Sequence, residues 1–114
     1  MDSDDARERL LAERRRVEGL AHELRSELGV AEDATELSDY DQHPADTATE
    51  TFERERDLGI LEDLEEELSE IEAALERVDN GTYGIDEITG EPIDPARLEV
   101  FPTARTNVDS REQD

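Results

Sequence analysis

The chain has 114 residues, of which 33% are hydrophobic and 41% charged, too few apolar residues for a large round core but enough for helices with a narrow apolar seam. Its formal net charge of −23, from 35 acidic residues against 12 arginines, argues against direct binding to nucleic-acid phosphates or an anionic membrane surface, and favours a basic protein partner. The chain contains no cysteine, which excludes disulfides, thiol catalysis and cysteine zinc sites.

The N-terminal part has the pattern of an amphipathic helix from about Asp4 to Leu28. Asp4 and Asp5 lie in its first turn, where acidic side chains suit the helix dipole, and Gly29 follows as a stop signal. From Leu10 onward the apolar residues recur at spacings of 7, 3, 4 and 4, which places them on one helix face. That face contains Leu10, Val17, Leu20, Leu24 and Leu28, with Leu11 and Ala21 beside it.

This periodicity ends after the first helix, and a polar stretch from about residue 30 to residue 46 is predicted to be a loop. A second helix is expected to start at Thr47, because Thr47 and Glu50 have the spacing of a capping box. Its apolar residues alternate at spacings of 3 and 4, a heptad pattern, until a stop at residues 79–81. The members of this seam are Leu61, Leu64, Leu68, Ile71, Leu75 and Val78.

Residues 81–109 have a different texture, with three glycines and three prolines. Two short strands joined by a tight turn are predicted at residues 83–85 and 88–93. Asp94 and Pro95 have the pattern of a helix start, an N-cap followed by proline at the first helical position, and a short helix is expected through about Val100. The tail, residues 110–114, is expected to be disordered.

The expected fold is therefore mainly α. Two amphipathic helices joined by one loop should fold back antiparallel and bury their seams together. Residues 1–80 are predicted to form a two-helix coiled-coil hairpin with its tip near residues 30–46. A small C-terminal zinc-finger-like knuckle follows at residues 81–109, made of a short β-hairpin and a short helix.

The run from Gly81 to Arg105 resembles the C-terminal knuckle of the DksA/TraR family of transcription regulators. The family pattern is Gly-x-Tyr-Gly-x-Cys-x-x-Cys-Gly-x-x-Ile, then Arg-Leu-x-Ala-x-Pro-x-Ala, then Cys-x-x-Cys, and its non-cysteine positions match densely here. The similarity covers about residues 38–108, while the first helix matches only in character. The four cysteine positions fall at Asp86, Thr89, Asn107 and Ser110.

The resemblance implies a structural zinc ion, but a carboxylate, an amide and two hydroxyls cannot supply the four soft or borderline ligands of such a site. We therefore expect no cofactor and no metal. The knuckle is expected to keep its fold through an apolar mini-core packed against the end of the second helix. The predicted members of this core are Tyr83, Ile85, Ile88, Ile93, Leu98, Val100, Phe101 and Val108.

The resemblance also implies a function and a site. In the family the hairpin enters the secondary channel of RNA polymerase, and acids at its tip approach the catalytic centre and alter initiation. The family's tip motif, Asp-x-x-Asp-x-Ala, falls on residues 43–48, where Asp46 and Ala48 match and His43 replaces the first acid. Asp41, two residues earlier, is a candidate to stand in for that acid. The simpler reading of Asp46 is that it precedes the helix cap and favours the helix dipole.

One alternative remains open at this stage: an acidic, salt-adapted coiled-coil interaction or structural protein without polymerase activity. An enzyme is not expected, because no nucleophile–base pair or phosphate loop accompanies the carboxylates. The loop before Thr47 and the capping box favour an intramolecular hairpin, so a monomer is expected. The chain has no apolar run near 18 residues and an acidic N-terminus, from which we expect a soluble cytoplasmic protein.

Overall fold

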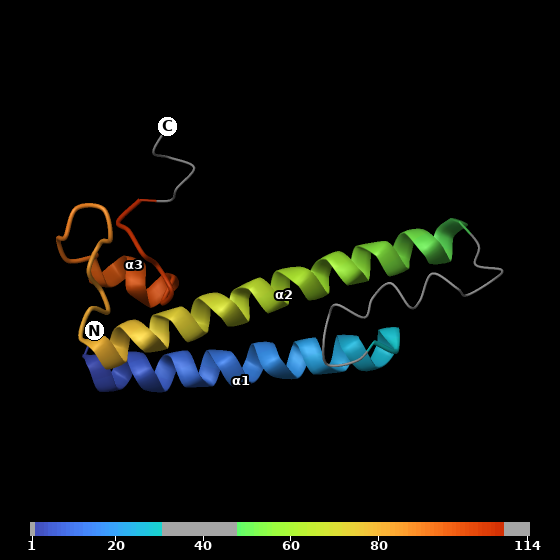
Figure 1. Cartoon of the computed structure of the whole chain (residues 1–114), viewed down its shortest axis with the longest axis horizontal. Coiled ribbons are helices and arrows are strands. Elements are labelled where there is room, and N and C mark those ends of the chain that lie inside the picture. The colour runs from blue at the N-terminus through green and yellow to red at the C-terminus, as the bar shows by residue number, and fades with distance from the viewer. Residues whose placement is uncertain (1, 31–47, 109–114) are drawn as a thin grey trace. The chain divides into compact units, whose positions relative to one another are not determined.

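The computed structural model describes residues 2–30 and 48–108, and three helices lie within these ranges (Figure 1). They are α1 (Ser3–Leu28), α2 (Ala48–Asn80) and α3 (Pro95–Val100). The prediction of a mainly α fold with two long helices and one short helix is confirmed. The chain divides into two compact units, Met1–Arg14 with Ser69–Asp114 and Arg15–Leu68, so each long helix contributes to both. No helix in the described part is long and apolar enough to cross a membrane.

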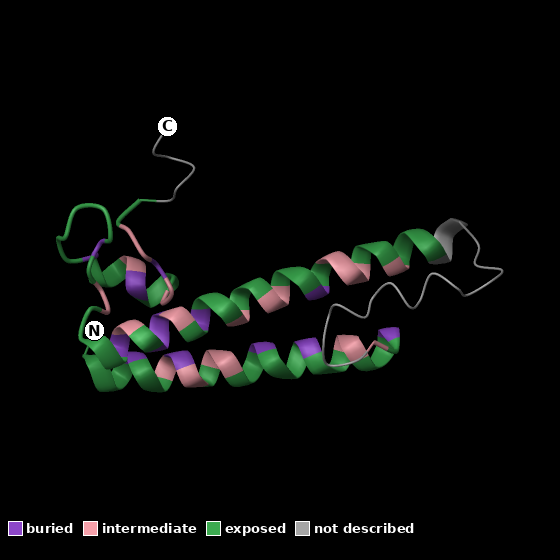
Figure 2. Ribbon diagram, in the orientation of Figure 1, coloured by how far each residue is buried: buried purple, intermediate pink, exposed green. Residues whose placement is uncertain are grey.

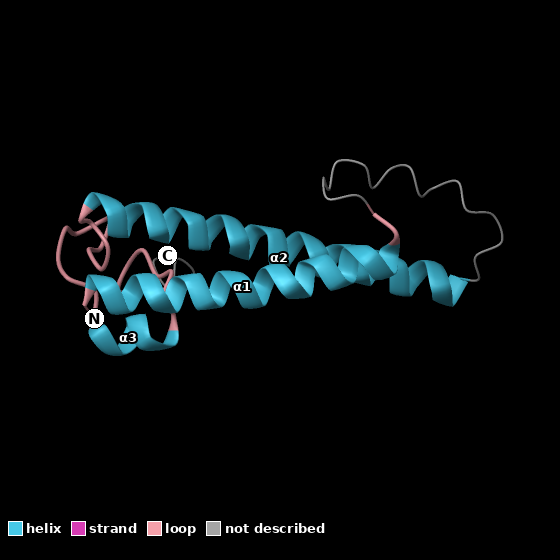
Figure 3. Ribbon diagram, turned by 90° about the horizontal axis from the view of Figure 1, so that it is seen from below, coloured by secondary structure: helices cyan, strands magenta, loops and turns pink. Residues whose placement is uncertain are grey.

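In the first unit, the start of α1 runs antiparallel to the end of α2 (Figure 3). Two ion pairs join them: Arg7 to Asp79 at 2.5 Å and Arg14 to Glu72 at 2.7 Å. Such exposed pairs contribute between about 0 and 1 kcal/mol each, so the buried seam supplies most of the stability. Its buried residues are Ala6, Leu10, Ile71, Ala74, Leu75 and Val78 (Figure 2).

In the second unit, the two helices again bury a narrow seam. Ala21, Leu28 and Leu61 are buried at its centre, and five partly buried residues pack on them: Leu24, Val30, Leu58, Leu64 and Leu68. Arg25 pairs with Glu65 at 2.8 Å in a half-buried position beside the seam. The guanidinium of Arg54 donates a hydrogen bond to the carbonyl oxygen of Leu28, at the C-terminus of α1, where the orphan carbonyls need donors.

Both long helices end in the same glycine motif. After α1 the Val30 N–H donates to the carbonyl of Arg25 at 2.9 Å, and Gly29 has a φ of 72°. After α2 the Thr82 N–H donates to the carbonyl of Arg77 at 2.8 Å, and Gly81 has a φ of 76°. These are the bonds of a Schellman motif, in which a left-handed residue lets the chain turn back onto the last helical carbonyls. Gly29 and residues 79–81 were predicted as helix stops, and the structure confirms both.

The C-terminal segment contains no strand in its described part, so the predicted β-hairpin is not confirmed. Only one isolated antiparallel bridge is formed, between Ile85 and Pro92. The reason is local: Gly84 and Gly90 both have positive φ, and the chain between them turns tightly instead of extending. The predicted short helix is present, and the Asp94 carboxylate accepts the Ala96 N–H at 3.0 Å, as an N-cap should.

The predicted apolar mini-core is largely wrong. Ile93 and Leu98 are buried together with Ala104, and Tyr83 packs on them half-buried. The other five predicted members are exposed: Ile85, Ile88, Val100, Phe101 and Val108, with Val100 86% exposed. The hydroxyl of Tyr83 donates to the carbonyl of Pro102 at 2.8 Å, which adds a polar link to this small core. Apolar burial alone therefore explains little of how the segment is held.

A pair of glycine substitutions in and after α2 should change stability in opposite directions. A Cβ at either Gly59 or Gly81 would meet nothing within 4 Å. Gly59→Ala should raise the free energy of unfolding by about 1 kcal/mol, because alanine is the better residue in a helix interior. Gly81→Ala should lower it by about 1–2 kcal/mol, because its backbone is left-handed. Urea unfolding followed by helical circular dichroism measures both, and changes of the same sign would contradict the assignment of Gly81 as the helix stop.

Candidate functional site

The predicted site residues fall into two groups, one at the tip and one at the four former cysteine positions. Asp41, His43 and Asp46 of the tip lie outside the described residues, and Ala48 is the first residue of α2. The roles predicted for these four residues therefore stay predictions. Of the four cysteine positions, Asp86, Thr89 and Asn107 are described, and Ser110 lies outside the described residues.

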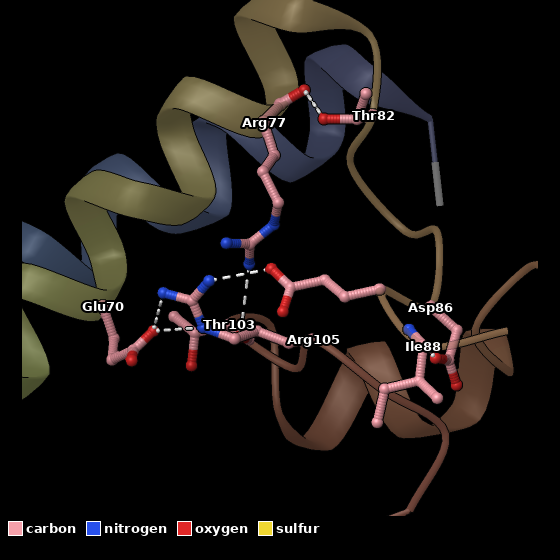
Figure 4. A network of polar contacts seen from close by, with 8 residues as sticks. Glu70, Arg77, Thr82, Asp86, Ile88, Thr103 and Arg105 are labelled. Atoms are coloured by element: carbon pink, nitrogen blue, oxygen red, sulfur yellow. Dashed lines mark hydrogen bonds and ion pairs between the residues drawn. The ribbon is translucent and has the colours of Figure 1, made fainter. Parts of the chain in front are cut away.

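Asp86 is buried, with 4% of its surface exposed, and its carboxylate accepts hydrogen bonds from two parts of the chain. Oδ1 accepts the N–H of Ile88 at 2.8 Å, and Figure 4 shows these two residues side by side. It also accepts the N–H of Thr89 at 3.0 Å, and the two bonds close the turn that follows Asp86. Oδ2 accepts the N–H of Asn107 at 2.9 Å, 21 residues further along the chain. Such local side-chain to backbone bonds are typical of aspartate in turns, but the bond to Asn107 is not local.

Asn107 returns the link with its own side chain. Its Oδ1 accepts the N–H of Asp94 at 2.8 Å, and its Nδ2 donates to the carbonyl of Pro92 at 3.1 Å. Asn107 thus connects the end of the described chain to the segment just before α3. The hydroxyl of Thr89 accepts the N–H of Glu91 at 3.2 Å within the turn. The structure therefore brings Asp86 and Asn107 into contact, as the cysteine pattern implied, through hydrogen bonds.

The hydrogen bonds hold the pKa of Asp86 below its ordinary value of 3.8. The N–H of Asn107 has the largest effect and that of Thr89 follows. Burial opposes them by raising the pKa, while the Ile88 N–H and the Thr89 hydroxyl add to the lowering. Asp86 is a charged, hydrogen-bonded carboxylate at neutral pH, as a buried charge requires.

This arrangement does not fit a zinc ion. The two carboxylate oxygens of Asp86 point at N–H groups, whose positive ends repel a cation. Thr89 and Asn107 offer only a hydroxyl and an amide, whereas structural zinc takes thiolate and imidazole. Across the described ranges, no cluster of three or more histidine, cysteine, aspartate or glutamate side chains could hold a metal.

Arg105 is the residue of this region that the sequence did not single out. Its guanidinium bridges Glu70 of α2, at 2.8 Å from Nη2, and Glu87, at 2.9 Å from Nη1 (Figure 4). The hydrogen bond that Arg105 donates to Glu70 raises the pKa of Arg105 most, followed by the one that it donates to Glu87. The carbonyl of Arg105 accepts the Glu87 N–H at 2.9 Å, so the two segments are joined twice. The one signal in the sequence was its place at the end of the matched motif.

Arg77 and Arg97 tie further parts of the first unit together. Arg77, on α2, donates from Nη2 to the carbonyl of Thr103 at 3.3 Å, and its burial lowers its pKa. Arg97, in α3, donates from Nε to the carbonyl of Thr106 at 2.7 Å, and its guanidinium lies 5.6 Å from the ring centroid of Phe101. Arg97 thus joins α3 to the chain at Thr106.

Known proteins are similar to this chain in sequence, and one solved structure is similar in fold. No model of a protein family matches the chain. The chain is 48% identical over 79 residues to the uncharacterized protein YteA of Bacillus subtilis, covering 69% of this chain and 33% of that protein. It is 42% identical over 69 residues to the RNA polymerase-binding transcription factor DksA of Caulobacter vibrioides, covering 60% of this chain and 49% of that protein. The chain thus spans between a third and a half of these curated relatives.

A solved structure covers nearly all of the chain. The transcription factor DksA2 from Pseudomonas aeruginosa matches with a TM-score of 0.76 and 31% sequence identity, over 97% of this chain and 81% of that chain. This likeness extends over both long helices as well as the C-terminal segment, because it leaves out so little of the sequence.

Replacing Arg105 tests whether its bridge stabilises the first unit. Arg105→Met should lower the free energy of unfolding by about 1 kcal/mol at low salt, because it removes two partly exposed ion pairs. The loss should shrink in 1 M salt, where charges are screened beyond about 3 Å. Arg56→Met is the matched control, since Arg56 pairs with its neighbour Asp57 in an exposed position. Equal losses in the two variants during urea unfolding would contradict a bridging role.

Proposed function

The chain belongs to the DksA/TraR family of transcription regulators, and on that premise we propose that it binds RNA polymerase and modulates the initiation of transcription. The observation that carries this proposal is the likeness to the transcription factor DksA2, at 31% identity over 97% of the chain. The name of a second relative, the Caulobacter protein, describes that protein as RNA polymerase-binding.

The proposed mechanism places the segment between α1 and α2 in the secondary channel of the polymerase. Residues 31–47 contain six acidic residues and no arginine, so this segment carries a concentrated negative charge. A carboxylate delivered near a magnesium-dependent centre would attract the metal ion or a basic side chain. Asp46 and Ala48 match the family's tip motif, and His43 occupies the position of its first acid. Asp41 is proposed to take over the role of that acid.

The net charge keeps one alternative in view: an acidic, salt-adapted interaction protein that never engages the polymerase. The two proposals differ in a measurable way. A polymerase-binding monomer should be retained by immobilised RNA polymerase at about 0.15 M salt, where surface charges are screened beyond roughly 8 Å. It should scatter light as a single copy. A dimer that the polymerase does not retain would favour the alternative.

The substitution Asp46→Ala tests the tip. We expect the effect of the protein on transcript yield in a purified system to fall about tenfold or more, equivalent to at least about 1.4 kcal/mol of lost interaction. The free energy of unfolding should change by less than about 1 kcal/mol, since the change removes at most an interaction with the helix dipole.

Glu36→Ala is the matched control, because it removes one negative charge from the same segment but lies outside the tip motif. It should keep most of the effect on transcription. Full activity of Asp46→Ala, or an equal loss in both variants, would mean that net charge rather than the motif acts on the polymerase.

A further inference from the structure

We propose that the Asp86 carboxylate performs, without any metal, the cross-linking role that zinc is expected to have in this family. It does so by joining the turn at residues 86–91 to the returning chain at Asn107. This inference concerns the C-terminal knuckle alone and stands apart from the proposed action on RNA polymerase.

The first argument is the position of the contacts. A zinc ion bound to two Cys-x-x-Cys pairs would fix residues 86 and 89 to residues 107 and 110. In the structure, Asp86 fixes its own turn through Ile88 and Thr89 and reaches Asn107 directly at 2.9 Å. Two former ligand positions, 21 residues apart, are thus joined by a side chain of one and the backbone of the other.

The second argument is that Asn107 closes the link from the other side. Three hydrogen bonds connect this residue to the segment before α3: its N–H to Asp86, its Oδ1 to the Asp94 N–H, and its Nδ2 to the Pro92 carbonyl. These bonds stabilise the folded state by joining parts of the chain that are distant in sequence, and unlike a disulfide they are lost on unfolding. The two residues together therefore act as one clasp.

The third argument is that packing does not suffice. The apolar core of this segment consists of Ile93, Leu98 and Ala104 with the half-buried Tyr83. The large apolar residues nearest the turn, Ile85 and Ile88, are exposed. A segment so short of buried apolar surface needs polar links, and a carboxylate that accepts N–H groups forms stronger hydrogen bonds than a neutral group does.

The surroundings of Asp86 also define when the clasp is closed. The groups that lower its pKa are the N–H groups of Asn107, Thr89 and Ile88 and the Thr89 hydroxyl. Among the charged neighbours, Glu87 is paired with Arg105 at 2.9 Å. Because the folded pKa of Asp86 lies below 3.8, its stabilisation is complete above that pH and is lost as the pH falls through the folded value.

Nuclear magnetic resonance of the wild-type chain tests the clasp without any substitution. During an acid titration, the amide resonances of Ile88, Thr89 and Asn107 should move together, with the same midpoint as the Asp86 carboxyl carbon and below pH 3.8. Three unrelated midpoints, or an Asp86 carboxyl that titrates at or above its ordinary value, would overturn the proposal.

Two substitutions at Asp86 extend the test. Asp86→Ala should speed hydrogen exchange at all three amides by about tenfold or more, since it removes their acceptor. Asp86→Asn keeps only one acceptor oxygen, so it should speed exchange at one side of the clasp, either at Asn107 or at Ile88 and Thr89. Glu91→Gln is the control, because it removes a charge from the same turn. The contact of Glu91 with Asp86 is made by its backbone carbonyl, which accepts the Asp86 N–H at 2.8 Å and is kept in this variant. Unchanged exchange in Asp86→Ala, or equal changes in the control, would refute the clasp.

Metal removal gives an independent result. The purified wild-type chain should show the same thermal midpoint with a chelator, without one, and with added zinc, because the three described ligand positions are occupied by hydrogen bonds. Mass spectrometry under native conditions should find no stoichiometric zinc. A midpoint that rises with zinc and falls with the chelator would show that a metal, and not the carboxylate, holds the knuckle.

Discussion

A shortage of apolar side chains is the constraint from which most of this structure follows. In the described ranges, the buried residues between α1 and α2 are all aliphatic, and in each unit they form a narrow seam. Such a seam can hold two helices together because the apolar spacing puts most of these residues against the partner helix, although Leu20, predicted on that face, is exposed and Ala21 beside it is buried. Few apolar side chains remain for the helix ends, the turns and the C-terminal segment, and these parts therefore depend on polar contacts.

Arginine supplies many of these polar contacts. Arg7 and Arg14 join α1 to α2 in the first unit, Arg25 does the same in the second, and Arg105 joins α2 to the turn after it. Each such contact neutralises one of the few basic residues against an acid of the same chain. The acids that remain in excess give the surface its negative field, and that field favours a basic partner. The excess of 35 acidic residues over 12 arginines thus explains both the arginine contacts within the chain and its negative surface.

The sequence predicted those parts of the fold that rest on local patterns. Apolar spacing along one face predicted both long helices, with a heptad pattern in the second, and Gly29 and residues 79–81 were predicted as their stops. The structure gives Gly29 and Gly81 a positive φ. The strands predicted at residues 83–85 and 88–93 are not found, because the side chain of Asp86 turns the backbone after Ile85 and leaves only the bridge between Ile85 and Pro92. Ile85 and Ile88 misled the mini-core prediction. The contact between Asp86 and Asn107 spans 21 residues and has no periodic signal. The role of the tip remains a prediction from the motif alone, because Asp41, His43 and Asp46 lie outside the described residues.

The exchange of cysteine for aspartate at position 86 has a simple physical reading. A free thiol has a pKa of about 8.5 and is mostly uncharged at neutral pH. It becomes a charged acceptor mainly when a metal stabilises the thiolate. A carboxyl group has a pKa near about 4, and it is charged at neutral pH with no metal at all. It also offers two oxygens, which here divide the near turn and the distant Asn107 between them. Aspartate can therefore keep two segments joined where metal supply or thiol oxidation would limit a zinc site. The link formed by Asp86 depends on pH instead of on a metal, and it weakens only at a pH below 3.8, where the carboxylate becomes protonated.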